Sequence, residues 1–114
     1  MQLFSFQPRS NTAPSVPEAS TPIAGTVTLT FSYTVLDFTC TAEIGSWAVP
    51  VGMRDGDTVQ AFVDISAGAQ TVATPAHSGA LVLNGAFDMS EAKKYLITIT
   101  RKGSTYIWAV ASAE

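Results

Sequence analysis

The side chains that could take part in catalysis are few and scattered. The chain has one histidine, His77, within the polar stretch Thr74-Pro75-Ala76-His77-Ser78-Gly79. A serine–histidine–acid triad would need the fold to bring a serine and an aspartate to this ring, and the glycines of a nucleophile elbow are absent. We therefore expect a solvated loop histidine rather than a general base.

The nine carboxylates show no paired arrangement along the sequence. Glycoside hydrolysis needs two of them about 5–9 Å apart within a cleft, which so small a body can hardly build. Asp55-Gly56-Asp57 looks like a calcium-loop fragment, but the twelve-residue ligand pattern is missing, so a turn is the better interpretation. Phosphate-cradling glycine loops are also absent. The sequence predicts no enzyme, no metal site and no cofactor.

Cys40 and the two tryptophans are the remaining residues with special chemistry. A single cysteine excludes an internal disulfide framework and a cysteine-rich zinc site, and between Thr39 and Thr41 it is expected to be a small buried hydrophobe. Trp108 falls on the apolar face of a predicted hairpin, which favours the core. Trp47 follows Gly45 and Ser46 and is the better candidate for an exposed ring on which a ligand could stack.

Composition narrows the class of partner. Only 13% of the 114 residues are charged, against about 25% in average globular proteins, and the net charge is −3. So little charge suggests a surface partly covered by neighbouring subunits, or else a monomer made polar by threonine, serine and glutamine. The six basic residues form no stripe, and the pairs at 93–94 and 101–102 stand at the ends of one predicted strand, where charge indicates solvent. We expect no nucleic-acid partner.

The first 24 residues are expected to form an extended arm. Four of the six prolines lie here, between serine, threonine, asparagine and alanine. Proline fixes φ and removes a backbone donor, so neither a helix nor an inner strand is expected. The tip Leu3-Phe4-Ser5-Phe6 is apolar and strand-like, which a free linker would not need. It lacks the charged start and apolar run of a signal peptide, and no window is long enough to span a membrane.

Two interpretations of this tip stay open. A polar spacer could deliver an apolar hook to a neighbouring copy or another partner, or the tip could fold back as a first strand of its own domain. For the first interpretation, the expected partner-binding residues are Leu3, Phe4, Phe6, Pro8, Arg9, Pro14 and Pro17.

Residues 25–114 read as a single β domain. Apolar residues alternate with threonine and serine over Val27–Val35, the pattern of a half-buried strand. Tyr95, Ile97 and Ile99 alternate in the same way. So do Tyr106, Trp108 and Val110 beyond a glycine turn, which predicts a hairpin whose apolar residues share one face.

Shorter strands are predicted between these two ends. Val59, Ala61, Val63 and Ile65 alternate after the Asp55-Gly56 turn, and 42–51 adds a strand broken near Pro50. Hairpin turns are expected at 66–68 and at Asn84-Gly85, and 89–94 could form a helical turn. Seven or eight short strands predict an antiparallel β-sandwich, jelly-roll or immunoglobulin-like, with a small barrel as the alternative.

In its architecture, an arm (1–24) followed by a sandwich (25–114), the chain resembles the head decoration, or cement, proteins of tailed bacteriophages. No sequence motif carries this resemblance. It implies a homo-oligomer that sits at contacts between major capsid proteins and stabilises the shell, so the protein would be made in the host cytoplasm and located on the capsid surface of the virion.

Two other functions are compatible with the sequence. One is a carbohydrate-binding or adhesion module that uses Trp47 or an aromatic face as its platform. The other is a bacterial immunoglobulin-like domain from a larger protein, although the chain opens with a methionine and an arm rather than in mid-strand.

Overall fold

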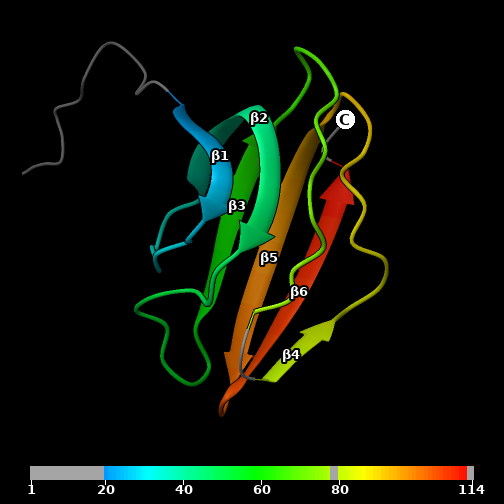
Figure 1. The fold of residues 1–114 in the computed structure, drawn as a ribbon. Helices are drawn as coiled ribbons and strands as arrows, with labels where there is room; N and C mark the ends of the chain where they lie inside the picture. The colour runs from blue at the N-terminus through cyan, green and yellow to red at the C-terminus, as the bar shows by residue number, and fades with distance from the viewer. Residues whose placement is uncertain (1–19, 78–79, 113–114) are drawn as a thin grey trace, which may run out of the picture.

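The computed structural model describes residues 20–77 and 80–112. These residues form six strands and no helix: β1 (Thr21–Val27), β2 (Leu36–Trp47), β3 (Thr58–Asp64), β4 (Ala80–Leu83), β5 (Lys94–Lys102) and β6 (Thr105–Ser112). All six belong to one sheet in the order β1-β2-β3-β5-β6-β4 (Figure 1). The predicted all-β fold is confirmed, whereas residues 89–94 form no helical turn.

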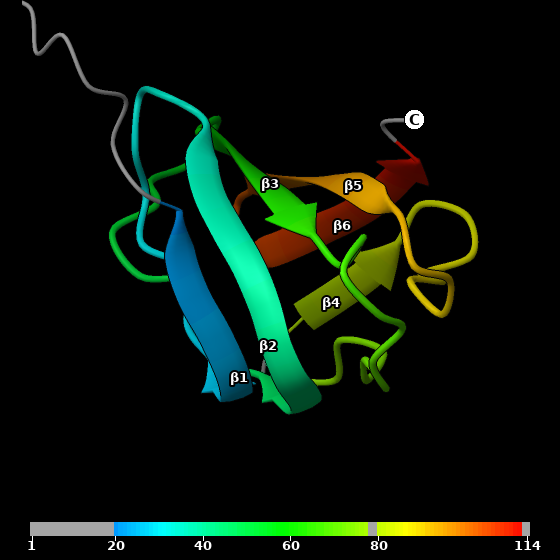
Figure 2. The same cartoon turned by 90° about the horizontal axis from the view of Figure 1, so that it is seen from above.

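The sheet is mixed rather than antiparallel. β1 with β2, β2 with β3, and β4 with β6 pair in parallel, and only β3 with β5 and β5 with β6 are antiparallel. Seen from above, the sheet curls so that β1 and β2 face β6 and β4 across the interior (Figure 2). The described residues therefore enclose their core with one curled sheet of six strands, not with an antiparallel sandwich of seven or eight.

Two predicted hairpins do not form, which accounts for this difference. After β3 the turn closes with Gly68 N donating to Ile65 O at 3.1 Å, but the chain then crosses to β2, where Val72 bridges Ile44. The antiparallel neighbour of β3 is β5 and not the segment that directly follows the turn. After β4, Asn84 N donates to Trp108 O at 2.8 Å, so β4 lies along β6 and the residues beyond Gly85 leave the sheet.

The predicted C-terminal hairpin is confirmed, and of the two loop positions compatible with the sequence, Gly103-Ser104 and Lys102-Gly103, the structure has the first. Ile97 pairs with Val110 and Ile99 with Trp108, so these apolar side chains share the inner face. Lys102 pairs with Thr105, which leaves a two-residue loop whose first residue, Gly103, has a φ of 62°. Glycine adopts such a positive φ without the clash that a Cβ introduces.

The predicted strand over Val27–Val35 is wrong beyond its first residue. β1 ends at Val27, and the following residues form only an isolated bridge between Thr30 and Val51. Val27 and Leu29 are still buried, but Tyr33 is 87% exposed. The alternating sequence pattern therefore continues beyond the residues that pair in the sheet and pack in the core.

The last residues of the expected arm lie in the sheet. Residues 21–24 belong to β1, and Pro22 aligns with Thr39 of β2. β1 is an edge strand, the one kind of strand that accommodates proline, because one side of its backbone needs no ladder partner. Residues 1–19, with the rest of the expected arm, lie outside the described residues.

The core lies inside the curl of the sheet. The predicted alternation over 59–65 is confirmed, because its four apolar residues are all buried. No polar or charged residue is buried in the described part of the chain. The fully buried side chains of greatest volume are Trp108, Leu29, Ile44, Ile65, Ile97, Ile99, Val59 and Val63.

Candidate functional site

The largest exposed apolar side chain of the described residues lies in the loop before β2. Tyr33 is 87% exposed and Val35 51%, and both belong to residues 31–35, which we call the aromatic loop. Val51, which is 53% exposed, is hydrogen-bonded to the start of this loop. Three of the four large apolar side chains that the described residues expose therefore belong to this loop or to the residue bonded to it. Exposed apolar groups that gather in this way mark interaction surfaces more often than isolated ones do.

Local contacts hold the aromatic loop in place. Phe31 N donates to Val51 O and Val51 N donates to Leu29 O, both at 2.8 Å. Buried Leu29 therefore anchors the base of the loop. The ring of Phe31 lies edge-on to that of Tyr33 with 4.9 Å between centroids, a favourable aromatic geometry. Farther along, Thr34 N donates to Ser32 Oγ at 3.2 Å, which closes a short turn.

A hollow of about 350 Å³ lies between the aromatic loop and β3. We call it the notch, and its lining residues are Ser32, Tyr33, Thr34, Val35, Thr58 and Gln60. It exists because β2 joins β3 only from Leu36, which aligns with Ala61, while the preceding residues turn away. None of the six lining side chains carries a charge, so the notch suits an uncharged, partly apolar ligand.

Trp47, the better candidate for an exposed ring and a possible ligand platform, is buried. Its side chain is only 2% exposed, and its ring lies 5.8 Å from that of Trp108 and 6.1 Å from that of Phe87, measured between centroids. Its indole N–H donates to Ala73 O at 2.8 Å. The glycine and serine before it lie on exposed positions of β2. Strict alternation would place Trp47 opposite Ile44, but the register of β2 against β1 shifts between Ile44 and Ser46, so both side chains are buried and Trp47 offers no ligand platform.

His77 is not the solvated histidine that the sequence predicts. Trp108 Nε1 donates to His77 Nε2 at 3.1 Å, and the imidazole lies edge-on to Tyr106 with 5.5 Å between centroids. The buried indole of Trp108 needs an acceptor, and this histidine supplies one. Its ring therefore closes one side of the aromatic core.

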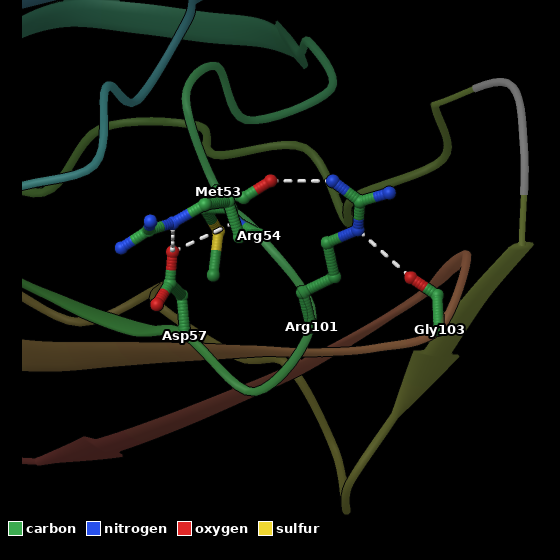
Figure 3. A network of polar contacts seen from close by, with 5 residues as sticks. All are labelled: Met53, Arg54, Asp57, Arg101 and Gly103. Carbon is green, nitrogen blue, oxygen red and sulfur yellow. Dashed lines mark hydrogen bonds and ion pairs between the residues drawn. The ribbon is translucent and has the colours of Figure 1, made fainter.

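Arg101 is also bound rather than solvated, contrary to the expectation for that basic pair (Figure 3). Its guanidinium donates to Met53 O through Nη1 and to Gly103 O through Nε, the latter at 2.8 Å, and it lies over the ring of Tyr106. Asp55 Oδ1 accepts a bond from Gly103 N at 2.7 Å. The predicted turn at 55–57 is confirmed, and it is tied to the β5–β6 loop.

The acidic and thiol groups serve local structure. Hydrogen bonds from the hydroxyl and then the backbone N–H of Ser66 lower the pKa of Asp64, and those of Ser90 lower that of Asp88 in the same way. Burial raises the pKa of Cys40, whose thiol donates to Ala42 O, so the predicted small buried hydrophobe is confirmed.

Among residues 20–77 and 80–112, no three histidine, cysteine or acidic side chains are grouped as metal ligands. No helix in this same part of the chain is long and apolar enough to cross a membrane. The predicted partner-binding residues Leu3, Phe4, Phe6, Pro8, Arg9, Pro14 and Pro17 all lie outside it.

The alternating pattern over 27–35, which predicts a strand, is the sequence signal for the aromatic loop. Phe31, Tyr33 and Val35 do alternate as an apolar face, but nothing in the described part of the chain covers the last two. Comparisons with models of protein families, with curated proteins and with solved structures find no match.

Proposed function

We propose that this chain is a virion structural protein, a capsid decoration or cement subunit that binds a shell of major capsid proteins and stabilises it. The observation that carries the proposal is the aromatic loop, with Tyr33 87% exposed on a body of low charge. In this proposal the chain works as a homo-oligomer on the capsid surface and carries out no reaction.

Physical chemistry supports an interface at the aromatic loop. Tyrosine is enriched at the centres of protein interfaces, because its ring buries a large apolar area while its hydroxyl can still donate and accept a bond. The rings of Phe31 and Tyr33 form a T-shaped pair, and the hydroxyls of Ser32 and Thr34 are hydrogen-bonded to each other, so the loop is ordered before binding. Such preorganisation lowers the entropic cost of association.

The low charge supports an assembly subunit as well. Charged residues are depleted at the centres of protein interfaces relative to the rest of the surface. Both the notch and the aromatic loop lack charged side chains, and the chain as a whole has only 13% charged residues. A partner that covers this surface therefore has no charge to desolvate there.

A carbohydrate-binding or adhesion module is the second candidate function. The exposed ring of Tyr33 favours it, because sugars stack on aromatic faces. The buried ring of Trp47 counts against it, since this removes one of the two platforms that the sequence suggested, the other being an aromatic face. A single tyrosine without a second parallel ring is a weak sugar platform.

Cosedimentation tests the proposal. The full chain is mixed with shells assembled from the major capsid protein encoded in the same genome, and bound protein is measured in the pellet. We expect binding that Tyr33→Ser weakens by on the order of tenfold, the loss of one aromatic anchor. Val82→Thr is the matched control, because Val82 is a 50% exposed apolar residue on β4, outside the loop.

Two results would contradict the proposal. One is wild-type protein that stays in the supernatant at every concentration of shells. The other is a titration with oligosaccharides that shifts the NMR signals of the Tyr33 ring while shells have no effect, which would favour the second candidate.

A further inference from the structure

The notch exposes part of a strand edge. β3 pairs with β5 along its whole length, from Thr58 to Asp64, but β2 covers its other side only from Ala61 onward. On that side, Thr58–Gln60 have no strand partner among the described residues. Backbone N–H and C=O groups along such an edge are available to an added strand.

The side chains around this edge suit an extended apolar segment. Tyr33 and Val35 form an apolar wall of the notch, and Gln60 adds an amide that can both donate and accept. An added strand beside Thr58–Gln60 would point alternate side chains toward that wall, since successive residues of a strand face opposite sides. The matching sequence is short, uncharged and apolar at every second position.

One segment of this chain has that sequence. Met1–Gln7 carries no charged side chain, and Phe4 and Phe6 are separated by a single serine. Nineteen residues precede the described part of the chain, and they lead directly into β1 at Thr21. The lack of charged side chains in Met1–Gln7 matches the uncharged lining of the notch.

The length and composition of the intervening residues favour a second copy over the same molecule. β1 and β3 are separated by one strand, so about 10 Å of sheet lies between them. Thirteen residues, 7–19, separate the tip from Ser20, and they can span about 40 Å when extended. Pro8, Pro14 and Pro17 bias the residues before them toward extended backbone, and a spacer with that bias favours the notch of another copy over one only about 10 Å away.

We propose that the notch of one copy binds the Leu3–Phe6 tip of another copy, as an added strand beside Thr58–Gln60 with Phe4 or Phe6 against Tyr33. This inference deepens the proposed function and rests on it in taking the chain to assemble with copies of itself. Each such contact would join two copies of the chain, through the notch of one and the Leu3–Phe6 tip of the other.

Disulfide trapping between purified full-length chains tests the inference without any shell. Chains carrying Ser5→Cys are mixed with differently tagged chains carrying Thr34→Cys and are then oxidised by air. Thr34 is exposed and lines the notch, so the change does not touch the core. The native thiol of Cys40 is buried and does not compete.

The control pair is Ser5→Cys with Val82→Cys, which places an equally accessible thiol on β4, outside the notch. We expect the Ser5→Cys and Thr34→Cys pair to yield more mixed dimer, by on the order of tenfold, and Phe4→Ser with Phe6→Ser to remove the excess. Equal yields from both pairs would overturn the inference.

A single chain with both changes, Ser5→Cys and Thr34→Cys, distinguishes the two possible sources of the tip. If it closes on itself at high dilution while the mixed pair gives no excess dimer, the tip folds back and the inference is wrong. Because shells are absent, these outcomes are independent of cosedimentation. Trapped dimers without shell binding would leave the inference standing and overturn the proposed function.

Discussion

The C-terminal hairpin and residues 27–35 carry the same alternating pattern, but the structure treats them differently. In the hairpin, Ile97, Ile99 and Trp108 lie on the inner face of paired strands and are buried. In the other segment only Val27 and Leu29 are buried, and exposure increases toward Tyr33. Alternation therefore shows which side chains share a face, whereas burial depends on whether another element covers that face.

This contrast suggests different roles for the covered and the uncovered apolar residues. An apolar face that the fold has covered contributes to stability, and one left uncovered within an ordered loop is available for a partner. The two regions should therefore respond oppositely to substitution: the hairpin through its free energy of unfolding, and the aromatic loop through association. The predictions below test that separation.

Truncation of the covered and the uncovered face should give the largest difference. Ile97→Ala is expected to lower the free energy of unfolding by about 2–5 kcal/mol, because it leaves a cavity in the core. Val35→Ala should change it by no more than about 0.5 kcal/mol. Urea unfolding followed by fluorescence of the two buried tryptophans measures both.

Similar losses at the two positions would show that the aromatic loop is covered within the monomer, and the contrast would fail. If Ile97→Ala does not fold, Ile97→Val is the milder variant, with an expected loss of about 0.5–1.5 kcal/mol.

The sequence predicted well those elements whose partner is close along the chain. The β5–β6 hairpin and its shared apolar face follow from two alternating runs around a glycine, because a short turn makes the second run the partner of the first. The alternation of β3 was likewise sufficient to predict its buried face. In both cases a local pattern contains all the necessary information.

Elements whose partner is distant were predicted poorly. β4 pairs in parallel with β6, and β1, which contains Pro22, pairs in parallel with β2 in a shifted register. Both pairings depend on contacts that no local pattern specifies. The candidate site was missed for the same reason. The notch forms only because residues 32–35 turn away from β3. Trp47 points inward because the register of β2 against β1 shifts between Ile44 and Ser46, which no local pattern specifies.

A substitution of Arg101 tests whether the turn at 55–57 contributes to stability together with the C-terminal hairpin. Its two donated bonds to backbone carbonyls hold that turn against the β5–β6 loop (Figure 3). Arg101→Lys keeps the charge but loses the planar fork, so we expect a loss of about 1–2 kcal/mol in the free energy of unfolding. Lys102→Arg, the control on the exposed neighbour, should have little effect, and equal losses would contradict this role.

The two-residue hairpin loop should be more sensitive to a Cβ than the open strand is. Gly103→Ala is expected to cost about 1 kcal/mol, because its φ of 62° disfavours any side chain. Gly45→Ala in β2 should be neutral or stabilising by up to about 1 kcal/mol, because alanine restricts the unfolded chain.

The pair is well matched, since an added Cβ meets nothing within 4 Å at either glycine. A difference in thermal unfolding midpoint between the two variants therefore reports backbone conformation rather than space. Equal midpoints would mean that the hairpin loop tolerates alanine and does not define the register.

The smallest expected effect compares two short turns, one at the end of covered β3 and one in the aromatic loop. Asp64 accepts bonds from Ser66 N at 2.8 Å and from Ser66 Oγ at 2.5 Å, and Ser32 Oγ accepts one from Thr34 N. The hydroxyl of Ser66 lowers the pKa of Asp64 from its ordinary 3.8. The turn at Ser32 contains no carboxylate.

The lowered pKa determines the direction of the pH dependence. The ionised form of Asp64 is favoured in the folded state, so its contribution is fully present above pH 3.8 and is lost as the pH falls through the lower folded pKa. Ser66→Ala should therefore cost less than about 1 kcal/mol near neutral pH, given the exposure of the pair, and less still near pH 2. Ser32→Ala should cost the same throughout. Urea midpoints from pH 6 to pH 2 measure both variants against the wild-type chain, and a Ser66→Ala deficit that stays constant would show that the charge on Asp64 does not stabilise the end of β3.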